Sequence, residues 1–140
     1  MAFDPIGFLA TGRLLLAKAP GSEATFRTVC GRAYYAVYGT MQSQLCRARG
    51  LSPGHLFGPR GRHGDVLNAL ALGSAQFKSI AAQYRRLHLA RVKSDYRYSA
   101  QVARQEAERA LDDADWVTSR LSGIPDREFR TLPLAPHRHR

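Results

Sequence analysis

The chain has 140 residues and a mass of 15.5 kDa, which is enough for one domain with a single hydrophobic core. Hydrophobic residues make up 44% and charged residues 23%, and these shares exclude wholesale disorder, a collagen-like repeat and a low-complexity chain. The formal net charge of +10, from 21 Lys and Arg against 11 Asp and Glu, favours a polyanion such as nucleic acid as the partner.

The N-terminal part of the chain predicts two helices. Asp4 and Pro5 form a helix-start signal, and the first helix is expected to continue to about residue 18 through Ile6, Leu9, Ala10, Arg13, Leu14 and Ala17. Pro20 and Gly21 end this helix. A second and longer helix begins at Ser22 and continues to about residue 49, with the core face Phe26, Val29, Cys30, Ala33, Val37, Tyr38, Met41 and Leu45.

The following part predicts a loop and three more helices. Residues 50–62 hold four glycines and two prolines and predict a loop, and a short third helix follows over 63–72. The fourth helix, about 74–92, has a packed stripe of Phe77, Ile80, Ala81, Tyr84, His88 and Arg91. The fifth helix, about 100–121, has a packed stripe of Ala103, Ala107, Ala110, Leu111, Ala114, Val117 and Leu121.

These elements predict an all-α protein. No segment alternates like a β-strand, so we expect an antiparallel bundle of four or five helices over residues 1–122. Residues 100–126 carry six acidic and three basic side chains and oppose the positive charge of the rest. Residues 123–140 contain three prolines and predict an extended basic tail, in which His137 and His139 are surface residues rather than metal ligands.

Several common sites are missing from the sequence. There is no phosphate-binding loop ending in Lys-Ser/Thr, no GxSxG or HExxH motif and no cluster of metal-binding carboxylates, so we expect no cofactor and no metal. Cys30 and Cys46 would lie roughly 24 Å apart on one helix, too far for a disulfide, and indicate reduced thiols of a cytoplasmic protein. No apolar run is long enough to predict a signal peptide or a membrane-spanning helix.

Two segments combine arginine with tyrosine, aspartate or histidine. On the second helix, the side away from the core carries a stripe of Thr28, Arg32, Tyr35 and Gly39. We expect a second structural element to pack against this stripe, in addition to the core on the other side of the helix. At the end of the fourth helix, Arg91 falls on the packed stripe, where a buried guanidinium needs a carboxylate. Asp95, four residues later, is the candidate, and the pair by itself would close the fourth helix against the second.

Three motifs occur in order along the chain. They are Gly31-Arg32-Ala33-Tyr34-Tyr35-Ala36, then His63-Gly64-x-Val66-x-x-Ala69-Leu70, and then Arg91-x-x-x-Asp95-Tyr96. Together they resemble the HEPN superfamily, the small helical "higher eukaryotes and prokaryotes nucleotide-binding" domain, over residues 5–121. The resemblance implies a bundle of four or five helices, often a homodimer, frequently encoded beside a minimal nucleotidyltransferase in toxin–antitoxin or defence systems. It also implies ribonuclease chemistry without a metal, which many members perform.

The resemblance implies which residues form the site. In the ribonuclease members, an arginine and a histidine near the end of this helix meet their counterparts across the dimer interface. Arg91 matches the arginine, whereas Val92 stands where a polar residue is usual and Tyr96 stands where the histidine would be. Tyrosine, with an ordinary pKa of about 10, is a poor general base at neutral pH. His88 or His63 would therefore have to accept the proton of the 2′-hydroxyl, with Arg91 stabilising the phosphate charge.

Two functions follow from the sequence. The first is binding of RNA, a nucleotide or a nucleotidyltransferase partner without catalysis, because Tyr96 replaces the expected histidine. The alternative is a metal-independent ribonuclease toxin that uses Arg91 with His88 or His63. Each residue also has a structural interpretation, since tyrosines pack, His88 can be a hydrogen-bonded core residue and arginines can reflect composition. The residues expected to hold RNA or another anion are Arg32, Tyr35, Arg60, Arg62, Arg85, Arg86, Lys93, Asp95 and Arg97.

Overall fold

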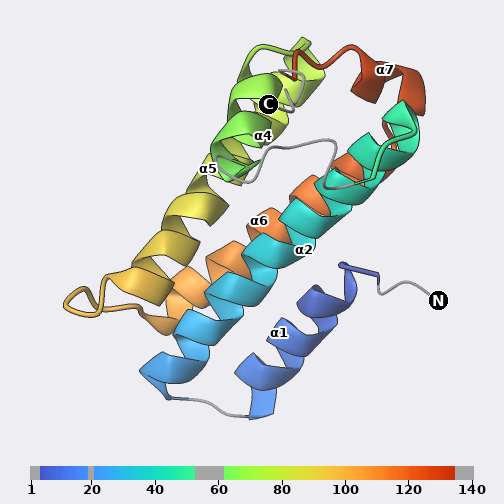
Figure 1. Cartoon of the computed structure of the whole chain (residues 1–140). Coiled ribbons are helices and arrows are strands. Elements are labelled where there is room, and N and C mark those ends of the chain that lie inside the picture. Colours follow the sequence, from blue (N-terminus) through green and yellow to red (C-terminus); the bar gives the residue numbers. More distant parts are fainter. Residues whose placement is uncertain (1–3, 19–20, 53–61, 135–140) are drawn as a thin grey trace.

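The computed structural model describes residues 4–18, 21–52 and 62–134, apart from the side chains of residues 62–65. All regular structure within these residues is helical, which confirms the predicted class (Figure 1). The helices are α1 (Gly7–Lys18), α2 (Glu23–Arg49), α4 (Arg62–Ala71), α5 (Ala75–Tyr96), α6 (Arg104–Ser122) and α7 (Asp126–Arg130). The long helices α1, α2, α5 and α6 alternate in direction along the chain, so the antiparallel bundle is also confirmed.

Helix α2 is the centre of the bundle and contacts α1, α5, α6 and α7. Its ends are set by local signals. The hydroxyl of Ser22 accepts a hydrogen bond from the Thr25 N–H at 3.4 Å, and Gly50 ends the helix in the left-handed conformation with φ 65°. Both limits agree with the sequence prediction. The position of α2 brings every other long helix within reach of its side chains.

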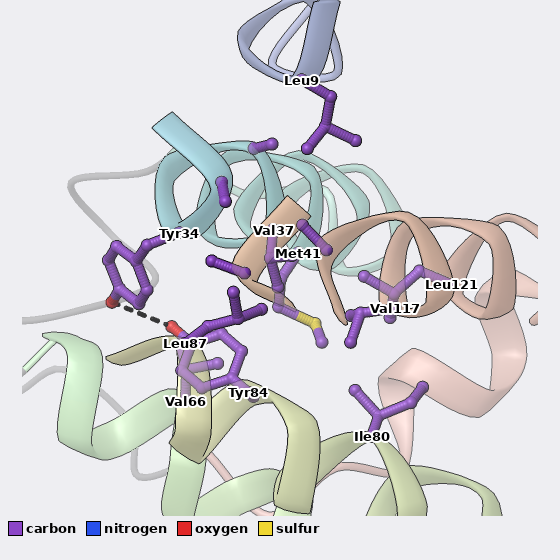
Figure 2. Close-up of a cluster of buried hydrophobic side chains, with 14 of the residues drawn as sticks. Leu9, Tyr34, Val37, Met41, Val66, Ile80, Tyr84, Leu87, Val117 and Leu121 are labelled. Atoms are coloured by element: carbon purple, nitrogen blue, oxygen red, sulfur yellow. Dashed lines mark hydrogen bonds between the residues drawn. The ribbon is translucent and has the colours of Figure 1, made fainter. Parts of the chain in front are cut away.

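The core lies between α2, α5 and α6. The predicted core face of α2 is buried, with Tyr38 only half-buried, and Tyr34 beside it is fully buried. Figure 2 shows Tyr34, Val37 and Met41 meeting Ile80, Tyr84 and Leu87 of α5 and Val117 and Leu121 of α6. The free thiols also agree with expectation, since Cys30 is buried and Cys46 is half-buried.

The predicted residue patterns of the first and fifth helices need correction. Of the six residues in the predicted pattern of α1, only Leu9 is buried: Ile6 and Leu14 are 43% and 54% exposed, and Ala10, Arg13 and Ala17 are exposed as well. The other buried residues of α1 are Gly12 and Leu16. Helix α1 therefore turns a different face to the core from the one that the sequence pattern predicts. Gly12 lies on this face and allows a close approach to α6, because a Cβ at Gly12 would lie 3.0 Å from Cδ2 of Leu111. In α6, the predicted stripe is buried except at its first member, Ala103, which is the exposed residue that precedes the helix.

The expected extended tail is wrong for residues 126–130, which form α7. Phe129 is fully buried, and its ring lies 5.4 Å from that of Phe77, centroid to centroid. Arg49 of α2 donates hydrogen bonds to the carbonyl oxygens of Phe129, Arg130 and Leu132 and so caps the C-terminal end of α7. The packed bundle therefore extends past residue 122. The histidines expected in the tail, His137 and His139, lie outside the described residues.

Within the described ranges, no helix is long and apolar enough to cross a membrane. The same ranges contain no group of three or more His, Cys, Asp or Glu side chains that could hold a metal ion.

Candidate functional site

Arg91 joins the end of α5 to α2 and lies at the centre of the site. Its Nη2 donates hydrogen bonds to the hydroxyls of Tyr35 at 3.0 Å and Tyr96 at 3.3 Å. Its Nε lies 3.0 Å from Oδ2 of Asp95, at an angle that makes an ion pair rather than a hydrogen bond. The predicted pairing with Asp95 is therefore present, and only 14% of the Arg91 side chain is exposed.

Tyrosine rings surround the Arg91 guanidinium. Its Cζ lies 5.9, 5.5 and 5.2 Å from the ring centroids of Tyr34, Tyr35 and Tyr96. These distances are within the range of cation–π attraction. Burial by itself lowers the pKa of Arg91, but Tyr35, Tyr96 and Asp95 outweigh it, so the pKa lies above its ordinary value. Arg91 is a permanent cation whose contacts position Tyr35, Tyr96 and Asp95.

His88 lies one turn before Arg91 on α5 and contacts the same tyrosine. The centroid of its ring is 5.5 Å from that of Tyr34, whose hydroxyl is 3.3 Å from the hydroxyl of Tyr84 (Figure 2). Burial, followed by the charge of Arg91, lowers the pKa of His88, so the imidazole is neutral at pH 7. Burial also raises the pKa of Tyr34 far above neutrality. The side chain of His63 lies outside the described residues.

Arg27 of α2 is a structural residue that sequence reasoning missed. Its Nη1 donates hydrogen bonds to the carbonyl oxygens of Lys93 and Ser94 at 3.0 and 2.8 Å, and its Nη2 donates to those of Arg97 and Ala100. These carbonyls end α5 and begin the α5–α6 connection, where helix geometry leaves oxygens without partners. No local signal could reveal this contact, because the acceptors lie 66 to 73 residues further along the chain.

The α5–α6 connection exposes two tyrosines on either side of an arginine. Tyr96 is 63% exposed, Tyr98 is 79% exposed, and Arg97 between them is also exposed. The guanidinium of Arg27 lies 5.9 Å from the centre of the Tyr98 ring, and Arg91 holds the hydroxyl of Tyr96. Both rings are therefore exposed to solvent. Each contacts an arginine that is also hydrogen-bonded to another helix: Arg91 to Tyr35 of α2, and Arg27 to the end of α5.

Arg32 lies on the side of α2 that faces α1. Its guanidinium is 5.5 Å from the centre of the Phe8 ring, and Phe8 also lies beside Tyr35, with centroids 6.5 Å apart. The neighbour expected for the stripe that contains Arg32 and Tyr35 is therefore α1 of the same chain. Within the described residues, no group accepts a hydrogen bond from Arg32, which is exposed. We call Arg32, Tyr96, Arg97 and Tyr98 the tyrosine–arginine surface.

Among the described side chains, the remaining predicted cations are paired with carboxylates or lie elsewhere, although Lys93 lines a hollow together with Arg97. Lys93 pairs with Glu106 of α6 at 2.8 Å, and Arg86 pairs with Asp113 of α6 at 2.8 Å. These two positive charges are neutralised locally. Arg85 is exposed on α5, nearly two helical turns before Arg91. Arg60 and the side chain of Arg62 lie outside the described residues.

Comparison of the chain with family models, with curated proteins and with solved structures finds no match. The helical bundle is observed, and membership of the HEPN superfamily stays a prediction from the three motifs.

Proposed function

We propose that this protein binds RNA with unpaired bases through the tyrosine–arginine surface. The observation that supports this proposal most directly is that two exposed tyrosine rings, Tyr96 and Tyr98, flank the exposed Arg97 in the sequence. Proteins that bind single-stranded nucleic acid combine aromatic side chains for base stacking with cations that follow the phosphates. The net charge of +10 agrees with a polyanionic partner.

The two tyrosines suit stacking because their surroundings hold them in place. Tyr96 is tied to Arg91 by a hydrogen bond of 3.3 Å, and Arg91 is in turn held by Tyr35 and Asp95. Tyr98 lies within a backbone segment, between Arg97 and Ala100, that Arg27 ties to α2. A ring that is already oriented loses less conformational entropy when a base stacks on it.

Arg32 and Arg97 are the cations proposed for the phosphates. Both are exposed, and neither has a carboxylate partner among the described residues. They differ in this respect from Lys93 and Arg86, whose charges are paired with α6. A cation without a partner can contact a phosphate without first breaking an ion pair.

The ribonuclease alternative stays a prediction. A neutral His88 is suited to accept a proton. Against it, the Nη2 and Nε atoms of Arg91 are engaged by Tyr35, Tyr96 and Asp95, and the side chain is largely buried. The single chain therefore favours binding over cleavage. A homodimer and a nucleotidyltransferase partner stay predictions as well.

Fluorescence anisotropy with a labelled oligouridine of about eight nucleotides tests the proposal. Tyr98→Ala should weaken binding about fivefold to a hundredfold, the loss of one stacked base, whereas Tyr98→Phe should bind like the wild type. Arg32→Ala should lower the slope of log K against log salt by about 0.7. Arg127→Ala removes the same charge from an exposed position on α7 and is the matched control.

Two results would overturn the proposal: no binding of the oligonucleotide at low salt, or equal affinities of the Tyr98→Ala and Arg127→Ala variants. Gel analysis of the same mixtures with a chelator shows whether the RNA stays intact. Cleavage that Arg91→Ala abolishes would replace the binding function with the ribonuclease.

A further inference from the structure

A hollow of about 200 Å³ opens on α2 beside the tyrosine–arginine surface. It is lined by Arg27, Thr28, Gly31, Arg32, Tyr35 and Asp95. Pockets for whole drug-sized ligands are typically about 300–1,000 Å³, so this hollow has room for one planar ring system rather than a complete nucleotide. We propose that it holds a guanine base of the bound RNA. This inference rests on the proposed RNA binding and adds a base preference to it.

Gly31 lines the hollow, and no packing contact in the described structure explains why this position is a glycine. Glycine in the interior of a helix destabilises it relative to alanine, and Gly31 lies in the middle of α2. Packing explains Gly12 and Gly39, because a Cβ there would lie 3.0 Å from Leu111 and 2.6 Å from Pro5. A Cβ at Gly31 would meet only Oδ1 of Asp95, at 4.0 Å. The protein's own packing would therefore accept alanine, and the missing side chain leaves the hollow open beside Asp95.

The polar groups of the hollow include an acceptor, the Asp95 carboxylate, and a donor, the Arg32 guanidinium. Oδ2 of Asp95 pairs with Arg91, while Oδ1 has no partner among the described residues and is the atom nearest to Gly31. An ionised carboxylate can only accept hydrogen bonds, and its two oxygens have about four acceptor positions, so Asp95 can accept from two donors while it pairs with Arg91. Arg32, which also lines the hollow, offers a planar array of N–H donors and lies against the Phe8 ring.

Guanine fits this pair better than the other RNA bases. Its Watson–Crick edge presents two adjacent donors, the 1-imino and 2-amino groups, and its O6 and N7 accept hydrogen bonds from arginine. Adenine, cytosine and uracil each place an acceptor beside any donor on that edge, and a carboxylate repels an acceptor. Asp95 therefore selects for guanine, and Arg32, whose five N–H donors can serve a base oxygen as well as a phosphate, reinforces the choice.

The test compares otherwise identical labelled oligouridines that carry one central guanosine, inosine or adenosine, using the full chain and fluorescence anisotropy. Guanosine should bind at least about tenfold more tightly than adenosine. Inosine, which lacks the 2-amino group, should fall between them. Gly31→Ala should remove the preference and leave affinity for plain oligouridine within about twofold, because the added methyl group takes the space beside Oδ1 of Asp95, at 4.0 Å, without a clash. Asp95→Asn should remove the preference as well.

The outcomes separate the two proposals. If no oligonucleotide binds the wild type, RNA binding itself is refuted. If all of them bind equally, RNA binding stands and the guanine site is wrong. A guanosine preference that survives in Gly31→Ala also overturns the site, and this variant keeps the Arg91–Asp95 pair intact, so loss of fold does not obscure the result.

Discussion

Replacing Arg27 with alanine tests whether this residue holds the candidate site together. The substitution removes the donors that the carbonyl oxygens of Lys93, Ser94, Arg97 and Ala100 now share. Hydrogen bonds from a charged donor contribute about 1.5–3 kcal/mol each, but they share one guanidinium and water can replace part of them. We therefore expect a total loss of about 2–4 kcal/mol in the free energy of unfolding.

Urea unfolding followed by circular dichroism measures this loss. Arg13→Ala is the matched control, because Arg13 pairs with Asp115 on the surface and both side chains are about half exposed, so its removal should cost at most about 1 kcal/mol. Arg27→Lys should recover only part of the stability, since one ammonium cannot reach the carbonyls that the planar guanidinium reaches. If Arg27→Ala lost no more stability than Arg13→Ala, the contacts of Arg27 would carry no weight in holding α5.

Three further predictions follow from the packing and from one titrating group. Gly31→Ala should stabilise the fold by about 0.5–1 kcal/mol, whereas Gly39→Ala should destabilise it by about 1–3 kcal/mol, because its Cβ would lie 2.6 Å from Pro5; thermal unfolding of the two variants should shift in opposite directions. Phe129→Ala should cost about 3–5 kcal/mol in urea unfolding, and a loss below about 1 kcal/mol would show that α7 is not part of the core. The pKa of His88 is lowered in the folded state, so its contribution to stability is complete above pH 6.5 and is lost as the pH falls through the folded pKa. His88→Gln should therefore lose less stability than the wild type between neutral and mildly acidic pH, and parallel pH profiles of the urea midpoint would contradict this.

The sequence was enough to locate the five longer helices and the Arg91–Asp95 pair of the site. The caps Ser22 and Gly50 and the apolar periodicity act over a few residues, so α2 was predicted within one residue at each end. The same local logic paired Arg91 with Asp95, since four residues make one helical turn. Local patterns of this kind are readable because the contacting atoms belong to neighbouring turns.

Only the tertiary structure decided how the helices meet. The face that α1 turns to the core depends on Gly12, which lies close to Leu111 of α6. Residues 126–130 form a helix in which the Phe129 side chain is buried in the core. Arg27 reaches acceptors 66 to 73 residues away, and the hollow beside Gly31 is lined by residues of α2 together with Asp95 of α5. Such contacts have no period in the sequence, because they depend on the distance between helix surfaces, and that distance is set by the packing of the whole bundle.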